Sequence, residues 1–226
     1  MPRIHRFRTV HLNSTNHCMW RSHNGERVLE DEKFADKFLE LLGKYKKQHG
    51  ILIHSYCLMG THPHVMVTAS KGQAEFSRFW KVVNWCFARF YNKKKKRCGQ
   101  VVRERLKSPT IRPDPDGRHQ LTVMTYTDMN PVRAGLAKSP GKWKFSSHRH
   151  YAYGEHNPLI DDAPEYLGLA YSPANKRKFY RNLFAKKRVQ EFMVSRPDFE
   201  CGLYVGESLE DARKRERAAV SKKPPR

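Results

Sequence analysis

Two histidines separated by one residue, His62 and His64, stand in the string LMGTHPHVMV and are the first candidates for chemistry. If this string forms a β-strand, both imidazoles project from the same face, because side chains alternate along a strand. Neutral imidazole is a common ligand of divalent transition metals, so the pair could share one ion. The alternative stays open that both are polar residues on the open face of a sheet, since the chain contains twelve histidines.

A second set of reactive groups lies in the string YTDMNPVRAGL, which contains Tyr126 and Asn130. If residues 119–130 are helical, these two side chains are four positions apart and share a face. An amide oxygen can complete a metal site beside two histidines, and it would bring the phenol close to that metal. Tyrosine is a weak acid in water (pKa about 10), and a metal that polarises a phosphate makes it a more competent nucleophile. The alternative is a core tyrosine that precedes a proline-terminated helix.

The charge of the chain indicates a polyanionic partner. Its 226 residues include 44 Lys plus Arg and 22 Asp plus Glu, a formal net charge of +22. Lysine and arginine release condensed counterions when they neutralise phosphates, so nucleic acid is the expected partner. The candidate DNA-contacting residues are basic positions close to the two reactive strings or in basic runs: Arg103, Arg105, Lys107, Arg133, Lys94 and Lys95.

Composition also argues against several classes of protein. No apolar run approaches the roughly 18–20 residues of a membrane-spanning helix, and the basic first ten residues precede no apolar signal segment. The five cysteines are odd in number and scattered without a CxxC pair, which argues against a disulfide framework or a zinc ribbon. We therefore expect a cytoplasmic protein with no membrane contact.

Hydrophobic patterning predicts the elements that must position these groups. Residues 6–13 predict a first strand, followed by a loop through Asn13, Ser14 and Asn16, and apolar stripes predict helices over 31–48 and 74–92. Ile51 to Met59 and His62 to Thr68 predict a β-hairpin. A further helix fits 173–190, and a basic, disordered tail is expected near the end. This order predicts an α+β fold, an antiparallel sheet with both of the first two helices on one face.

The string YCLMGTHPHVMV resembles the paired-histidine region of HUH-type nucleases, and YTDMNPVRAGL resembles the nucleophile helix of IS200-like, single-tyrosine (Y1) transposases. The Asn-Pro-Val-Arg-Ala-Gly-Leu run and the later Trp-Lys-Phe-Ser-Ser segment at 143–147 are especially similar to the REP-associated tyrosine transposase branch, and Arg103 to Ser108 resembles a basic segment of that family. The resemblance covers roughly residues 6–170. Residues 1–170 are accordingly expected to form the nuclease domain, and 171–226 a helical extension with a basic tail.

This resemblance implies a ferredoxin-like sheet and a definite chemistry. His62, His64 and Asn130 would bind Mg²⁺ or Mn²⁺, and Tyr126 would attack a DNA phosphate to give a 5′-phosphotyrosine link and a free 3′-hydroxyl. The substrate would be single-stranded or hairpin DNA with a flanking recognition tetranucleotide. The protein would act as a monomer, as in the REP-associated branch, or as a homodimer.

Two prolines, Pro63 and Pro131, lie in or next to predicted elements that proline usually disrupts. The family commonly has Met-Pro-Asn before the first histidine and an aliphatic residue between the two, where this chain has Met-Gly-Thr and Pro63. Because proline removes a backbone donor, we expect this strand to lie at a sheet edge or to be distorted. Pro131 biases Asn130 away from helical geometry, which makes Asn130 the weakest of the proposed ligands.

Other residues offer alternatives to these assignments. Tyr91, Tyr151 and Tyr153 are other possible nucleophiles; Tyr91 ends an apolar stripe and is interpreted as structural, whereas the other two could also stack on bases. His11 and His17 are interpreted as surface or loop histidines. Two rival functions remain open: a hairpin DNA- or RNA-binding protein without cleavage, and a metal-dependent phosphodiesterase that uses water.

Overall fold

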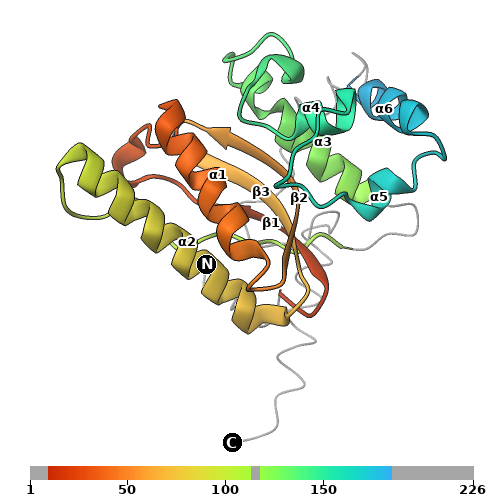
Figure 1. The fold of residues 1–226 in the computed structure, drawn as a ribbon. Helices are drawn as coiled ribbons and strands as arrows, with labels where there is room; N and C mark the ends of the chain where they lie inside the picture. Colours follow the sequence, from red (N-terminus) through yellow and green to blue (C-terminus); the bar gives the residue numbers. More distant parts are fainter. Residues whose placement is uncertain (1–9, 113–117, 185–226) are drawn as a thin grey trace, which may run out of the picture.

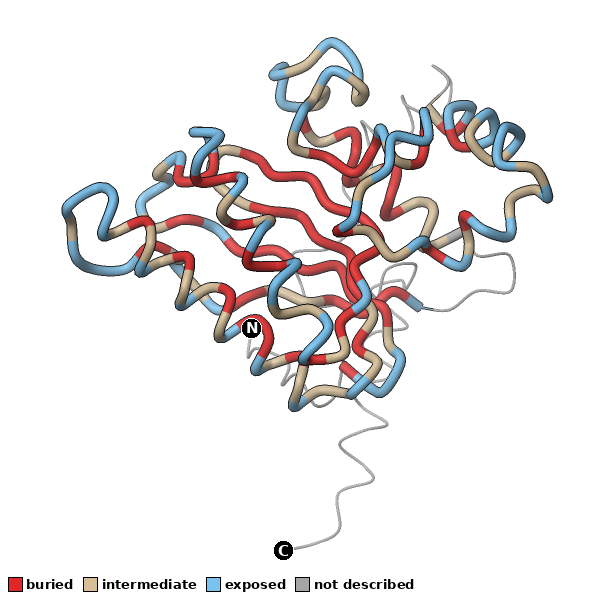
Figure 2. Tube along the Cα trace, in the orientation of Figure 1, coloured by how far each residue is buried: buried red, intermediate tan, exposed pale blue. Residues whose placement is uncertain are grey.

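The computed structural model describes residues 10–112 and 118–184 (Figure 1). At its centre is an antiparallel sheet of three strands, β1 (Ser14–Met19), β2 (Ile51–Met59) and β3 (His62–Ala69), in the order β1-β3-β2. The sheet is red in Figure 2, which marks its strands as almost entirely buried. β3 is therefore the central strand, paired with β1 from Met19–His64 to Ser14–Ala69 and with β2 from Met59–His62 to Ile51–Ala69.

Residues 101–111, here called the edge segment, continue the sheet beyond β1. Isolated bridges join Met19 to Lys107 and Asn16 to Thr110, and Ser22 to Val102 just past the strand. The resulting order, edge segment-β1-β3-β2, is that of a ferredoxin-like fold. On the other side, Leu58 N–H donates to Phe145 O at 2.9 Å, so a short stretch covers the free edge of β2. Both sheet edges are thus partly paired, which protects them from intermolecular pairing.

Two helices cover one face of the sheet, α1 (Glu32–Lys46) and α2 (Gly72–Lys95). Asp31 caps α1, because its side chain accepts a hydrogen bond from Lys33 N–H. Their apolar stripes meet alternate strand residues such as Val65 and Val67 in the first hydrophobic core. Each fully buried side chain of this size contributes about 1.5–3 kcal/mol by leaving water.

The opposite face is covered by α3 (Arg118–Arg133), which contacts β2 and β3. Behind α3 lie three short helices, α4 (His148–Tyr153), α5 (Pro164–Leu167) and α6 (Pro173–Asn182), which gather at the right of Figure 1. They form a second core in which Met66 of β3 meets Val123 and Met124 of α3, together with Tyr151 and Tyr180. No helix within residues 10–112 and 118–184 is both long and apolar enough to cross a membrane.

The α+β class is confirmed, as are the hairpin and the first two helices, but the first strand was predicted in the wrong place. Residues 10–13 are not strand, and β1 runs through Ser14–Met19, where a loop was expected. The polar side chains that suggested a loop form hydrogen bonds with residues far away in the sequence: Asn16 Nδ2 donates to Thr110 Oγ1 at 2.8 Å. Of the predicted helix 173–190, α6 covers Pro173–Asn182 and residues 183–184 form a turn, so the helix was predicted too long; residues 185–190 and the predicted basic tail lie outside the described residues.

The expectation that Pro63 places its strand at an edge was also wrong. Pro63 pairs with Leu58 in β2, whereas the ladder with β1 covers His64 to Ala69 and does not include the proline. Pairing resumes beyond it, because Ser22 N–H donates to Thr61 O at 2.9 Å. The central strand therefore accommodates a proline where the ladder with β1 has already stopped.

Candidate active site

His62 and His64 project from the same face of β3, as their spacing predicted, and their ring centroids lie 4.9 Å apart. This is the face that α3 covers. His64 is 1% exposed, and His62 is partly buried. The hairpin turn directly before His62 fixes the position of the pair at one end of the sheet.

Hydrogen bonds at the Nδ1 atoms orient both rings. Thr61 Oγ1 lies 2.8 Å from His62 Nδ1, and His17 Nε2 lies 3.1 Å from His64 Nδ1. The Nε2 atom of each ring is the nitrogen left for a ligand. For His64 this atom is buried and has no hydrogen-bond partner among the described residues. A partner on one nitrogen that leaves the other for a ligand is the usual arrangement around metal-binding histidines.

His17 is the residue that sequence reasoning missed. It was interpreted as a surface or loop histidine, but it is fully buried on β1 and its ring stacks on that of His64 at 5.1 Å with an interplanar angle of 13°. It pairs in register with Met66, so it projects from the same face as His64. Only the correct placement of β1 would have revealed it.

All three histidines have lowered pKa values. Burial, with a smaller contribution from His62, lowers the pKa of His17 from its ordinary 6.5 to about 3. Burial, together with the positive charge of Arg21, lowers that of His62 to about 4. Burial also holds the pKa of His64 well below its usual value, and neighbouring histidines and arginines add to the effect. The imidazoles are therefore neutral at pH 7, the form in which histidine binds metals.

Tyr126 of α3 faces this histidine cluster. Its ring centroid lies 6.0 Å from that of His64 and 6.2 Å from that of His17, both edge-on. The guanidinium carbon of Arg133, two turns further along α3, lies 4.9 Å from the centre of the tyrosine ring. Arg133 Nη1 is buried with no hydrogen-bond partner within the described ranges. A phenol, neutral imidazoles and an arginine thus converge from α3, β1 and β3.

Asn130 lies one turn beyond Tyr126 and holds the helix together where Pro131 interrupts it. Pro131 has no N–H to donate to Thr127 O, and Asn130 Nδ2 donates to that carbonyl at 3.2 Å and to Tyr126 O at 3.0 Å. The expectation that Pro131 draws Asn130 out of helical geometry was therefore wrong, since α3 continues to Arg133. Because the amide nitrogen is turned toward the helix, Oδ1 is the atom left for a ligand.

The sequence after Asn130 ends the helix in a defined way. Gly135 has φ +70°, a left-handed conformation that glycine adopts without strain. Its N–H donates to Val132 O at 3.0 Å, and Leu136 N–H donates to Pro131 O at 2.8 Å. This pair of bonds is a Schellman motif, which fixes the last turn of α3 and with it the position of Arg133.

The donor chemistry of the cluster limits how a metal could be held. No group of three or more His, Cys, Asp or Glu side chains suited to a metal ion occurs in the described part of the chain. A metal on His62 and His64 would therefore need a ligand of another type, and the amide oxygen of Asn130 is the one that the sequence predicts. The buried, unpartnered Nε2 of His64 fits such a role.

The predicted DNA-contacting residues fall into three regions, the first of which is α3, where Arg133 lies beside Tyr126. Arg103, Arg105 and Lys107 lie on the edge segment, with Lys107 opposite Met19 and the two arginines exposed. Lys94 and Lys95 lie at the exposed end of α2, where they stand over the rings of Phe90 and Phe34 respectively. The helix end is thus on the α1–α2 side of the sheet, away from Tyr126.

The other tyrosines are less suitable as nucleophiles. Tyr91 is 7% exposed in the first core, and Tyr151 is fully buried, donating from its hydroxyl to His54 O at 2.6 Å. Tyr151 therefore cannot stack on bases. Tyr153 is exposed, and its ring lies against that of His148 rather than against the histidine cluster.

Comparison with known proteins agrees with the resemblance found in the sequence. Residues 11–106 match the model of the family described as "Transposase IS200 like", a range that includes the three histidines but ends before Tyr126. A REP-associated tyrosine transposase from Escherichia coli (strain K12) is 28% identical over 114 residues. That match spans 49% of this chain and 63% of the relative's length.

The fold has a counterpart among solved structures. A structure of a REP-associated tyrosine transposase bound to a REP hairpin matches with a TM-score of 0.53 and 20% sequence identity. The match covers 72% of this chain and 93% of the other. At this identity the likeness concerns the fold, and it confirms the arrangement of sheet and helices.

Proposed function

From its kinship with the IS200-like single-tyrosine transposases and their REP-associated branch, we propose that this chain is a metal-dependent endonuclease and strand transferase for single-stranded DNA. Its substrate is hairpin DNA with single-stranded flanks, and the reaction passes through a 5′-phosphotyrosine intermediate. The observation that supports this proposal most strongly is the convergence of Tyr126 with His64 and His17 within one chain. Since one chain contributes these three side chains, the proposal assigns the reaction to a monomer.

The metal site in this proposal consists of His62, His64 and Asn130. Both histidines present Nε2 because Thr61 and His17 occupy their Nδ1 atoms, and Asn130 presents Oδ1 because its nitrogen is bonded to the helix. A divalent metal such as Mg²⁺ or Mn²⁺, when bound, supplies Lewis-acid polarisation of the scissile phosphate. His17 contributes by orienting His64.

The chemistry assigned to Tyr126 balances without an energy source. Its hydroxyl oxygen attacks the phosphorus and loses its proton to solvent, while the bond from phosphorus to the 3′-oxygen breaks and that oxygen takes up a proton. In rejoining, a second 3′-hydroxyl attacks the phosphotyrosine and releases the phenol. One phosphoester bond replaces another at each step, so ATP is not needed. Arg133, whose Nη1 is buried beside the phenol, would hold a phosphate oxygen.

A covalent-adduct assay tests this proposal. A labelled pool of hairpin DNAs with a randomised single-stranded flank is incubated with Mn²⁺, and protein–DNA adducts are resolved under denaturing conditions. Adducts are expected for the native protein and for Tyr153→Phe, an exposed tyrosine that serves as the matched control, but not for Tyr126→Phe. EDTA should abolish them.

The other outcomes identify the rival functions. An adduct that persists in Tyr126→Phe contradicts the assignment of the nucleophile. Cleavage without any adduct indicates a phosphodiesterase that uses water. Tight binding of the pool with no cleavage in Mg²⁺ or Mn²⁺ indicates a binding protein on the same scaffold.

A further inference from the structure

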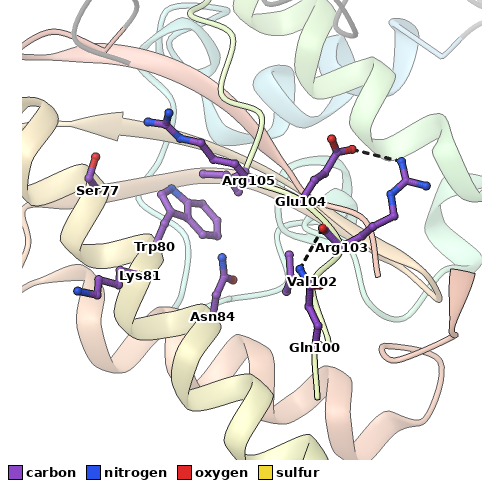
Figure 3. Close-up of a pocket in the computed structure, with 10 residues that line it drawn as sticks. Ser77, Trp80, Lys81, Asn84, Gln100, Val102, Arg103, Glu104 and Arg105 are labelled. Carbon is purple, nitrogen blue, oxygen red and sulfur yellow. Dashed lines mark hydrogen bonds and ion pairs between the residues drawn. The ribbon is translucent and has the colours of Figure 1, made fainter. Parts of the chain in front are cut away.

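A surface pocket of about 570 Å³ lies between α2 and the edge segment, outside the histidine cluster (Figure 3). Ser77, Trp80 and Asn84 line it from α2, and Arg103 and Arg105 line it from the edge segment. Figure 3 shows the Trp80 and Asn84 side chains pointing from α2 toward the edge segment. These residues take no part in the chemistry assigned to Tyr126.

Two buried polar atoms of this pocket have no hydrogen-bond partner within residues 10–112 and 118–184. Trp80 is 1% exposed, and its Nε1 donor has no hydrogen-bond partner among the described residues. The same holds for the buried Oδ1 acceptor of Asn84, one helical turn further along. Buried polar atoms are normally satisfied, so an unpaired donor and acceptor on one wall of a pocket point to a ligand that offers both an acceptor and a donor.

The rim of the pocket is basic. Lys81, Arg103 and Arg105 are exposed there, and the acidic residue in the lining, Glu104, lies 3.5 Å from Arg103. Such a rim attracts phosphates, but phosphate oxygens only accept hydrogen bonds at neutral pH. A phosphate alone would leave Asn84 Oδ1 unsatisfied, whereas the edge of a nucleobase carries donors beside acceptors.

Backbone pairing connects the pocket with the histidine site. Arg103 N–H donates to Arg21 O at 2.8 Å, and the next residue, Ser22, donates from its N–H to the carbonyl oxygen of Thr61, which directly precedes His62, at 2.9 Å. Arg103 is thus separated from His62 by two strand-to-strand spacings across the sheet, roughly 10 Å in total. A single DNA strand that reaches the histidines can therefore extend over the sheet edge to the pocket.

We propose that this pocket receives one unstacked nucleobase of the single-stranded DNA, with backbone phosphates bound by Arg103 and Arg105. Trp80 Nε1 and Asn84 Oδ1 bind the base edge, and the pocket reads the strand outside the hairpin. The inference rests on the proposed function for the identity of the nucleic acid. Taking a base out of its stack into a protein pocket is an established mode of readout.

Binding of short oligonucleotides tests this assignment separately from cleavage. Fluorescence anisotropy at fixed salt compares oligo(dA), oligo(dC), oligo(dT) and mixed dT/dG decamers with a decamer that is wholly abasic. The native protein should bind at least one base-carrying decamer about tenfold more tightly than the abasic one. Asn84→Leu and Trp80→Phe should remove this preference with little change in affinity for the abasic decamer. Asn175→Leu, an exposed position on α6, should leave it intact.

The outcomes separate this inference from the proposed function. If both pocket variants fold, as circular dichroism would show, and keep the full preference for bases, the pocket does not bind a base. Persistence of the Tyr126 adduct in that case leaves the proposed function standing. If the native protein shows neither adduct nor any preference for bases, both fail together. Using two pocket variants keeps the test decisive if one of them does not fold.

Discussion

Replacing Tyr180 by phenylalanine tests how α3, the helix that carries Tyr126, is held on the side away from the histidine cluster. Tyr180 of α6 is fully buried, and its hydroxyl donates to Asp128 Oδ2 of α3 at 2.7 Å. Asp128 also lies 2.8 Å from His148 Nδ1 of α4. Because Tyr126 and Asp128 are two positions apart, they point to nearly opposite sides of α3. The Asp128 contacts therefore fix the helix that carries the phenol without touching the site.

The size of the effect follows from what the substitution removes. Tyr180→Phe keeps the ring, which packs against those of Tyr151 and Phe184 at centroid distances of 5.4 Å each. It deletes one hydrogen bond to a buried carboxylate, a class worth about 1.5–3 kcal/mol. We expect the free energy of unfolding to fall by about 2 kcal/mol. For a domain of this size, Tm should fall by about 4–8 °C.

Urea denaturation followed by far-UV circular dichroism measures this loss, with thermal melting as a second readout. The matched control is Tyr171→Phe, the same change at a fully exposed tyrosine, which should alter stability by less than about 0.5 kcal/mol. A loss for Tyr180→Phe no larger than that of the control would refute the reasoning. It would mean that the hydroxyl of Tyr180 does not stabilise Asp128 in solution.

Three further predictions concern the site and its supports. Asn130→Ala should lower the free energy of unfolding by about 1–2 kcal/mol in urea denaturation, and by less in a Pro131→Ala background, where the backbone N–H is restored; equal losses in both would contradict the role of the amide nitrogen. His17→Gln should weaken Mn²⁺ binding by about 10–100-fold in titration calorimetry, whereas the exposed His11→Gln should not. Burial lowers the pKa of His54, so the unfolded chain binds a proton at this residue before the folded chain does, and the free energy of unfolding should fall as pH drops below about 6.5. Urea denaturation at neutral and acid pH should show a smaller fall for His54→Asn. An unchanged fall would mean that other groups cause the pH dependence.

The sequence predicted the elements whose evidence is local. The apolar stripe through Phe34 and Phe38 gave α1, and the stripe from Phe76 to Phe87 gave α2, because both repeat at the helical period along a single segment. The turn at Gly60 gave the hairpin and the shared face of the two histidines. Each of these features depends on neighbours within one or two turns of chain, which the sequence displays directly.

β1 could not be predicted in the same way, because its stability depends on distant residues. Asn16 and His17 are polar and therefore predicted a loop. Both are nevertheless buried, because Thr110 and His64 form hydrogen bonds with them across the sheet. The edge segment that supplies Thr110 lies 94 residues away in the chain. Without the register of these strands, the third histidine of the cluster could not be distinguished from a surface residue.

The two prolines show where local rules fail for a physical reason. Proline has no N–H, so it removes one backbone hydrogen bond from a strand or helix. It disrupts the element only where that bond is needed and no other group donates in its place. At Pro63 no such bond is needed, because the ladder with β1 covers His64 to Ala69 and does not include the proline. At Pro131 it is supplied, because Asn130 Nδ2 takes the place of the lost donor.

The replacement of the missing Pro131 N–H by the Asn130 amide links the structure of α3 to its proposed chemistry. An asparagine side chain has a donor end and an acceptor end, and here the donor end is fixed by two helix carbonyls. The acceptor oxygen is then held in one orientation on the face of Tyr126, which lowers the conformational cost of using it as a ligand. The proline, which from the sequence argued against Asn130, leaves an open carbonyl that the Asn130 amide fills. The proline that counted against Asn130 in the sequence is thus also the reason why the orientation of its amide is fixed.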